Sequence, residues 1–266
     1  MKIGFIGTGN MGGALARAAA KGGHTLLLAN RTPAKAAVLA KELGGTVCPN
    51  AEAAETAELL FLGVKPQGLP GLAGELAPVL QARKGNAPVV VSMATAVTLR
   101  ELDAMLGGGL PLIRIMPNTP AAVGAGTILY AAQNVTDAQL NAFRAVLAQA
   151  GLLLPLPEAQ IDAASAISGC GPAFCFQFAD ALALGGVRAG LSYPDACRLA
   201  AQTMLGAAEM LLQGGEAPDV LKMRVCSPAG TTIEGVLALE QGGFSYTVQN
   251  AVTAAYRRTV EMTRKG

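Results

Sequence analysis

A glycine-rich turn close to the N-terminus is the first pattern with chemical meaning. Gly7, Gly9 and Gly12 form G-x-G-x-x-G after the apolar run Lys2–Ile6 and at the start of an Ala-rich stretch. The first glycine permits a tight bend, the second lets the backbone approach a pyrophosphate, and the third lets helix and strand lie close together. A turn without a ligand is the alternative, but the flanking strand and helix supply the context that the motif requires. We expect a dinucleotide to be bound here by Gly7, Thr8, Gly9, Asn10, Met11 and Gly12.

The end of the second apolar run, Thr25–Ala29, predicts which dinucleotide is bound. An NAD site has Asp or Glu at this place to hold the ribose 2′-OH. This chain has Asn30, Arg31 and Thr32 there, and no acidic residue before Glu42. A guanidinium pairs with a phosphate in a bidentate manner, whereas a carboxylate would repel it. The sequence therefore predicts NADP(H) as the cofactor, with NAD(H) less preferred. The alternative is an arginine that is merely solvated at a helix start.

Two further apolar runs end in proline-containing segments. Lys65 and Pro66 end the run Leu59–Val64, and MPNTP (116–120) ends the run Leu112–Met116. Ligands of open α/β sheets lie outside the carboxyl ends of the strands, so both segments are expected on the cofactor side. For MPNTP a rigid connecting loop without ligand contact is an equal alternative, because Pro-Asn is ordinary turn chemistry.

The segment CSPAGTTIEG (226–235) is the candidate substrate site. Thr231 with Glu234 three residues later fits a capping box, which predicts a helix start. The amides of Gly230 and Thr231 would then be free to bind an anion, and Ser227 and Thr232 add hydroxyl groups. A carboxylate or phosphate ligand is favoured. The alternative is a self-capped helix that binds nothing, and the local physics alone slightly favours it.

Composition excludes several classes of protein. Of 266 residues, 52% are hydrophobic and 14% charged, which excludes a disordered chain. A net charge of +2 without a basic tract gives no reason to expect a nucleic-acid partner. The most apolar stretches, Leu59–Val64 and Pro88–Val97, are too short to cross a bilayer, so no membrane partner is expected. Five cysteines without a C-x-x-C pair, and an N-terminus unlike a signal peptide, favour a reducing cytoplasm over disulfides or zinc. A single histidine excludes a mechanism that needs a His base and a His ligand together.

The first half of the chain alternates strands with helices. Strands are expected at Lys2–Ile6, Thr25–Ala29, Leu59–Val64, Val89–Met93 and Leu112–Met116, and helices at Met11–Ala20 and Pro33–Leu43. This alternation predicts an α/β fold, a Rossmann-type doubly wound sheet covered on both faces. The segment LLLPLPEAQ (152–160) has two prolines and then an acid, and predicts the end of the first domain. We therefore expect a cofactor domain at 1–157 and a second domain at 158–266.

The second half shows no strand pattern and is expected to be all-helical. The predicted helices are Ile161–Ile167, Ala173–Gly185, Pro194–Leu212, Pro218–Val225, Thr231–Gln241 and Tyr246–Lys265. The second of these is apolar nearly all round, and a helix without a polar face must be buried on most sides. A domain of about 110 residues has little room to bury several such helices. Burial against a second copy of the chain is the simplest remedy, so a dimerisation domain is expected.

Taken in order, these segments resemble the pyrroline-5-carboxylate reductases over essentially the whole chain. The similar segments are GFIGTGNMGGAL, ANRTPAK, VKPQ, RIMPNTPAAVGAG, AISGCGPAF and CSPAGTTIEGVLALEQGGF. The resemblance implies reduction of the cyclic imine 1-pyrroline-5-carboxylate to L-proline, the last step of proline biosynthesis. It also implies a homodimer, which in many members assembles into a decamer of five dimers.

The resemblance assigns roles to single residues. It implies a pyrophosphate site at Gly7, Gly9 and Gly12, and a 2′-phosphate site at Asn30, Arg31 and Thr32. It places Asn50 beside the adenosine and implies a V-K-P cofactor contact at Val64, Lys65 and Pro66. It implies a nicotinamide site lined by Met93, Ala94, Asn118 and Pro120. It implies that the substrate carboxylate is bound by Ser227, Gly230 and Thr231. Thr232 would lie beside the imine nitrogen as the catalytic residue. Cys226 and Ala229 stand where Ser and Gly are the more usual residues of the family.

Two other functions are weighed against this one. A β-hydroxyacid dehydrogenase shares the layout but uses a lysine in its helical half, and no lysine occurs between Lys84 and Lys222. A nonenzymatic NADP-sensing protein would need the glycine-rich turn but not the SPAGTT segment. A protonated imine is already electrophilic, so alignment of the reactants can supply much of the catalysis. No covalent nucleophile is required.

Overall fold

The computed structural model describes residues 1–83 and 85–263. The chain forms two compact units. Unit 1 contains Met1–Cys170 and the C-terminal residues from Tyr256 onward, and unit 2 contains Gly171–Ala255. Each unit is described by itself below.

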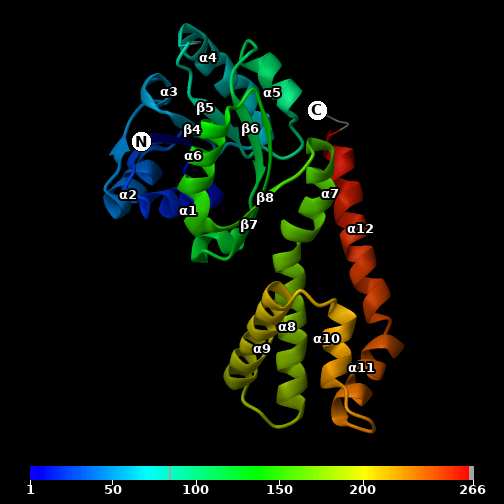
Figure 1. Cartoon of the computed structure of the whole chain (residues 1–266). Coiled ribbons are helices and arrows are strands. Elements are labelled where there is room, and N and C mark those ends of the chain that lie inside the picture. Colours follow the sequence, from blue (N-terminus) through cyan, green and yellow to red (C-terminus); the bar gives the residue numbers. More distant parts are fainter. Residues whose placement is uncertain (84, 264–266) are drawn as a thin grey trace. The chain divides into compact units, whose positions relative to one another are not determined.

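An eight-stranded sheet forms the centre of unit 1 (Figure 1). Its strands are β1 (Lys2–Ile6), β2 (Thr25–Ala29), β3 (Thr46–Val47), β4 (Leu59–Leu62), β5 (Val89–Ser92), β6 (Leu112–Met116), β7 (Gly126–Gln133) and β8 (Gly151–Pro155). The strand order is β3-β2-β1-β4-β5-β6-β7-β8, and every neighbouring pair is parallel except β6 with β7. The predicted Rossmann-type sheet and its five predicted strands are confirmed.

The sequence analysis missed the last two long strands. The segment LLLPLP, which we interpreted as a domain end, forms β8 and pairs in parallel with β7. Leu152 and Leu154 are 54% and 38% exposed, because β8 is the edge of the sheet. An edge strand tolerates a proline at its end, since only one side needs ladder hydrogen bonds. The prolines therefore mark a sheet edge, and do not end the fold at that point.

Helices cover both faces of the sheet, and each face has its own apolar core. One core lies under α1 (Asn10–Ala20), α2 (Pro33–Leu43) and α6 (Asp137–Leu147). The other lies under α3 (Asn50–Thr56), α4 (Leu69–Ala82), α5 (Leu99–Met105) and α7 (Glu158–Ser168). Phe5 and Phe61 stack on neighbouring strands with ring centroids 4.6 Å apart. This double cover explains why β1, β4 and β5 are apolar runs without alternation.

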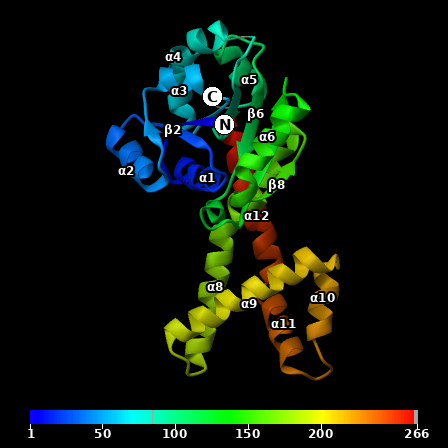
Figure 2. The ribbon, with the colours of Figure 1, turned by 60° about the vertical axis from the view of Figure 1, so that its left-hand side comes forward.

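Unit 2 is built only from helices in the part of it that the structure describes. They are α8 (Gly171–Arg188), α9 (Tyr193–Gly214), α10 (Pro218–Val225), α11 (Thr231–Gln241) and the first turns of α12 (Phe244–Thr263). All six helices predicted for the second half of the chain are found. The last two residues expected in the final one, Arg264 and Lys265, lie outside the described residues. α9 packs on α8 where Gly186 meets Ala196 (Figure 2).

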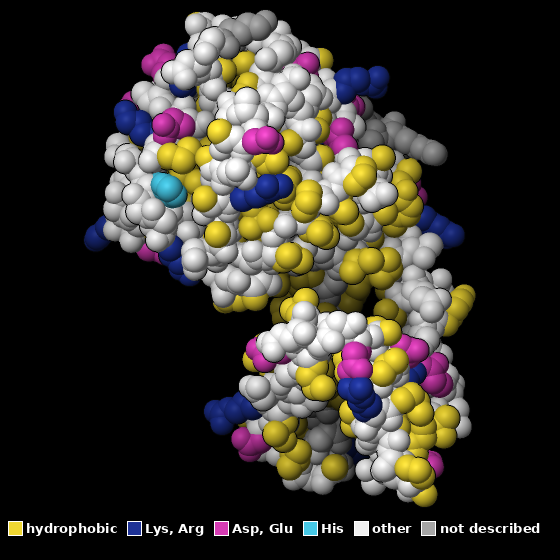
Figure 3. All heavy atoms as spheres, in the orientation of Figure 1, with side chains coloured by type: hydrophobic (Ala, Val, Ile, Leu, Met, Phe, Trp, Pro, Cys, Tyr) yellow, Lys and Arg dark blue, Asp and Glu magenta, His cyan; other side chains and the backbone are white. Residues whose placement is uncertain are grey.

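Many large apolar side chains of unit 2 are exposed in a single chain (Figure 3). They include Phe176, Leu184, Leu199, Leu212 and Tyr246. The expectation that no segment could span a bilayer missed one candidate, because the consecutive helices in Glu158–Arg188 are long and apolar enough by length and composition alone. Little of that segment is buried within one chain. Exposed apolar surface of this extent requires a partner surface.

Candidate functional site

The glycine-rich turn joins β1 to α1, and an added side chain would meet different surroundings at each of its three glycines. Gly7 has φ +97, and a Cβ added there would lie 2.5 Å from the carbonyl oxygen of Gly63. A Cβ on Gly12 would collide with the carbonyl oxygen of Gly7. Gly9 has nothing within 4 Å of its Cβ position. Gly7 and Gly12 are thus required by the fold, whereas at Gly9 the space stays open for a ligand.

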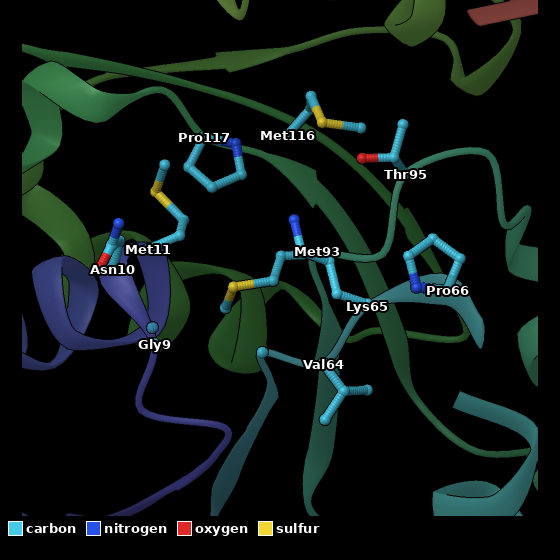
Figure 4. Close-up of a pocket in the computed structure, with 12 residues that line it drawn as sticks. Gly9, Asn10, Met11, Val64, Lys65, Pro66, Met93, Thr95, Met116 and Pro117 are labelled. Atoms are coloured by element: carbon cyan, nitrogen blue, oxygen red, sulfur yellow. The ribbon is translucent and has the colours of Figure 1, made fainter. Parts of the chain in front are cut away.

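A cavity of about 420 Å³ opens beside this turn (Figure 4). Figure 4 shows the side chains of Met11, Met93 and Met116 around it. Of the predicted cofactor residues it brings together Gly9, Asn10, Met11, Gly12, Val64, Lys65, Pro66 and Met93. Gly63, Thr95, Met116 and Pro117 also line it, although the sequence analysis did not name them as contacts. The carboxyl ends of β1, β4, β5 and β6 therefore meet at one cavity, as a parallel sheet requires of its ligand site.

The residues predicted for the 2′-phosphate and adenosine lie outside this cavity. Asn30, Arg31 and Thr32 connect β2 to α2, where the Asn30 side chain donates to the Thr32 carbonyl at 3.0 Å and Arg31 is exposed. Asn50 begins α3 and its amide donates to Glu75 at 3.1 Å.

Glu42, the first acidic residue after β2, forms an ion pair with Arg17 at 2.6 Å. The hydrogen bond from the Arg17 guanidinium holds the pKa of Glu42 below its usual value. This carboxylate is therefore occupied in pairing α2 with α1, and the turn after β2 carries the uncompensated charge of Arg31.

The remaining predicted nicotinamide residues stand behind the cavity wall. Ala94 is buried, and Pro120 lies in the short helix η2 (Thr119–Val123). The Asn118 side chain accepts from the Thr127 amide and donates to the Ser168 carbonyl, each at 2.8 Å. Asn118 is only 7% exposed. Its side chain is thus engaged within unit 1 on both sides.

The turn itself fits the pyrophosphate of a dinucleotide. Gly9 caps α1 without a side-chain hydrogen bond, and no acidic residue stands in the first turn of α1. The first amides of a helix have no partner within the helix, so here they remain available to an anion. The Thr8 hydroxyl is buried and has no hydrogen-bond partner among the described residues. A bound phosphate would supply the acceptor that this hydroxyl lacks.

The substrate segment differs from expectation in its capping. α11 does begin at Thr231, but Gly230 is the N-cap and no side chain caps it, so the predicted capping box of Thr231 with Glu234 is wrong. Thr231 lies one residue too far into the helix to act as its cap. The Gly230 amide donates to the Ser227 carbonyl at 3.0 Å, so it is not free for an anion as we expected. The first amides of α11, at Thr231, Thr232 and Ile233, are the ones left for a ligand.

Ala229 precedes this helix start in a left-handed conformation, with φ +56. A Cβ is disfavoured there, and glycine is the usual residue. We expect Ala229→Gly to raise the free energy of unfolding by about 0.5–1 kcal/mol, since relief of strain outweighs the added freedom of the unfolded chain. Urea unfolding measures the change. Ala238→Gly, inside α11, is the matched control and should destabilise by about 0.5–1 kcal/mol. Equal losses in both variants would contradict the strain at Ala229.

Comparisons with known proteins point to one family. The family model for pyrroline-5-carboxylate reductase dimerisation matches residues 158–262, and that for NADP oxidoreductase, coenzyme F420-dependent, matches residues 2–96. A pyrroline-5-carboxylate reductase of Synechocystis is 39% identical over 100% of this chain and 99% of its own. One of Pseudomonas aeruginosa is 38% identical over 98% of this chain and 96% of its own.

Solved structures agree with these relatives. A pyrroline-5-carboxylate reductase structure from Coxiella burnetii superposes with a TM-score of 0.89 at 32% identity, covering 97% of each chain. A Plasmodium falciparum pyrroline carboxylate reductase, solved with NADP bound, gives a TM-score of 0.86 at 30% identity and covers 99% of each chain. Match in sequence and in structure extends over both units, and the chain belongs to the pyrroline-5-carboxylate reductase family.

Proposed function

We propose that this chain reduces 1-pyrroline-5-carboxylate to L-proline with NADPH, the last step of proline biosynthesis. The observation that carries the proposal is one cavity at four strand ends, built around a turn that leaves Gly9 open. The full-length identity to reductases that act in this way supports the substrate. The relatives named above do not favour the two other functions, a β-hydroxyacid dehydrogenase and an NADP sensor.

The residues of this chain hold and align the reactants. When bound, the reduced nicotinamide supplies a hydride. Gly9 and the first amides of α1 bind the pyrophosphate, and Arg31 pairs with the 2′-phosphate. Around the ring, Met93 and Met116 exclude water from the cavity wall. These contacts fix the cofactor face, so that the reacting carbon is presented in one orientation.

The helix start at α11 holds the substrate. The Ser227 hydroxyl and the Thr231 amide bind its carboxylate. The Thr232 hydroxyl accepts a hydrogen bond from the N–H of the protonated imine. That bond keeps the proton on nitrogen and leaves the ring carbon electrophilic. Because carboxylate and imine are held by adjacent residues, the ring has a single orientation.

A direct assay tests the function. Purified chain with NADPH should consume 1-pyrroline-5-carboxylate and form proline, followed by loss of NADPH absorbance and by product analysis. 3-Hydroxyisobutyrate with NADP is the control for the dehydrogenase alternative and should give no turnover. Binding of NADPH without any turnover of the imine would favour the sensor.

The division of labour that we propose is a cofactor domain at 1–157 and a dimerisation and substrate domain at 158–266. The match to the dimerisation model over residues 158–262 supports this boundary. The compact units divide elsewhere, because α7 packs on the sheet of unit 1 through the fully buried Ile161. Helix α7 thus packs with the cofactor unit, although the family model assigns it to the dimerisation domain.

The dimerisation model shows that the helical half serves assembly, and the exposed side chains of unit 2 supply the apolar surface for it. We expect a homodimer at micromolar concentration, and propose five dimers in a decamer within the cytoplasm. Light scattering measures the mass. A fully active monomer at micromolar concentration would contradict the dimer, and a stable dimer alone would contradict only the decamer.

Gly9 offers a test of the cofactor site that leaves the fold intact. Because nothing lies within 4 Å of the added Cβ, Gly9→Ala should unfold at the wild-type temperature. Its methyl group would stand where the pyrophosphate approaches, so the Kd for NADPH and for NADH should both rise, by about tenfold or more. Fluorescence titration measures both constants. Gly12→Ala is the contrasting variant and should lose thermal stability, since its Cβ meets the Gly7 carbonyl.

A further inference from the structure

The joint between α7 and α8 contains a backbone acceptor that the helix cannot satisfy. In a continuous helix the Ser168 carbonyl would accept from the amide of residue 172. That residue is Pro172, which has no N–H. The joint also contains Gly169, Cys170 and Gly171, and the chain passes there from unit 1 into unit 2. A partly buried carbonyl that lacks its helical donor costs free energy unless another group bonds to it.

Asn118 supplies the missing donor. Its Nδ2 donates to the Ser168 carbonyl at 2.8 Å, and its Oδ1 accepts from the Thr127 amide at 2.8 Å. At 7% exposure the side chain is shielded from competing water. The two bonds fix the orientation of the amide, because its nitrogen must face Ser168 and its oxygen must face Thr127. Only a side chain with a donor and an acceptor of this geometry serves both partners.

Asn118 is also next to the cavity wall along the chain. It directly follows Met116 and Pro117, which line the cofactor cavity. One side chain therefore joins the wall of the cavity to the end of the helix that leads into unit 2.

The start of α7 is also attached to unit 1, through Leu99 after β5 and Arg114 on β6. Glu158 accepts from the Leu99 amide at 2.6 Å, and Arg114 on β6 contacts Glu158 at 3.4 Å and Asp162 at 2.5 Å. Leu99 begins α5, directly after the segment with the cavity residues Met93 and Thr95. Both ends of α7 are therefore bonded to segments that follow β5 and β6.

We propose that Asn118 is a positioning residue, whose amide fixes the end of α7, the last helix of unit 1 before the chain enters unit 2, beside the cofactor cavity. This inference rests on the proposed function, because the substrate residues Ser227 to Thr232 belong to unit 2. Its side chain is held by Thr127 and Ser168 and is not among the residues that line the cofactor cavity. A loosened joint would leave cofactor binding intact and would spoil the alignment of imine and nicotinamide, on which turnover depends.

Asn118→Asp tests the proposal in the full-length enzyme. The carboxylate still accepts from Thr127 but cannot donate to Ser168. We expect kcat with 1-pyrroline-5-carboxylate to fall roughly ten- to a hundredfold. The Kd for NADPH should stay within about threefold of wild type. Asn141→Asp, at an exposed site on α6, is the matched control and should leave both constants unchanged. If the carboxylate of Asn118→Asp prevents folding, Asn118→Ala is the second variant, because it removes both bonds without adding a charge. It too should lower kcat and leave the Kd for NADPH nearly unchanged.

Amide hydrogen exchange tests the joint without any substrate. The amides of Gly169 and Cys170 both donate to the Ser165 carbonyl and so report on the end of α7. They should exchange about tenfold faster in Asn118→Asp than in wild type and in Asn141→Asp. A rise in the Kd for NADPH with unchanged kcat would overturn the proposal and make Asn118 a cofactor ligand. Unchanged exchange and unchanged kcat would overturn it as well. Inactive wild-type enzyme with faster exchange in the variant would refute the proposed function and leave the joint as described.

Discussion

Thr232→Ala should lower kcat and kcat/KM for the imine together, by roughly ten- to a hundredfold. The Thr232 hydroxyl is proposed to accept from the iminium N–H, and its loss should cost about 1–3 kcal/mol of transition-state stabilisation. Steady-state kinetics with 1-pyrroline-5-carboxylate measures both constants. The Kd for NADPH should not change, because the residues proposed to hold the cofactor are in the other unit. Because the loss of one hydrogen bond is limited to this size, the variant should keep measurable activity.

Ser227→Ala is the matched comparison from the same helix start. Its hydroxyl is proposed to bind the carboxylate, which is much the same in substrate and transition state, so KM should rise while kcat changes little. Identical kinetic effects of both variants would contradict the separation of roles. A loss in Thr232→Ala far above a thousandfold would make Thr232 a proton donor. No loss at all would leave the segment as a helix start without a ligand.

Arg31→Ala should raise the KM for NADPH roughly ten- to a hundredfold and hardly change the KM for NADH. Charge-assisted hydrogen bonds contribute about 1.5–3 kcal/mol, and only NADPH carries the 2′-phosphate that makes them. Lys41→Ala is the control, because it removes one positive charge from the last turn of α2, at the opposite end of the helix that follows Arg31. Equal changes for both cofactors would refute the assignment of Arg31 to the 2′-phosphate.

Periodicity and glycine spacing predicted the parts of the fold in which local and tertiary preferences agree. β1, β2 and the helices that follow them were predicted within one residue, since a doubly covered strand must be apolar throughout. β7 and β8 were not predicted, although β7 contributes Leu129 to one core and Tyr130 to the other. Edge position is a property of the whole sheet, so the prolines after Leu154 carried no local sign of it.

In the candidate site, too, local features were predicted and features that depend on distant partners were not. The glycine spacing identified Gly7 and Gly12 as positions where a side chain does not fit, and the structure shows the obstructing carbonyl groups. The approach of a pyrophosphate at Gly9 stays a prediction. The capping of α11 was misplaced by one residue, because Thr231 and Gly230 are both acceptable caps and only the turn from Ser227 decides between them. Asn118 was assigned to the nicotinamide by resemblance, and its bonds to Thr127 and Ser168 join segments 9 and 50 residues away. No local pattern encodes such partners.

The return of the C-terminal residues to unit 1 bears on how the chain folds as it is made. Arg258, Glu261 and Met262 line a cavity together with Thr95 and Glu101, although about 160 residues separate them in sequence. On the ribosome, the sheet can assemble as soon as β8 has emerged, whereas this cavity cannot form until Arg258 to Met262 have been made. Unit 2 is therefore an insertion in unit 1, because the chain leaves unit 1 at Cys170 and belongs to it again from Tyr256. The apolar helices of unit 2 are consequently made before the residues that complete unit 1, and their exposed side chains are open to other contacts in that interval.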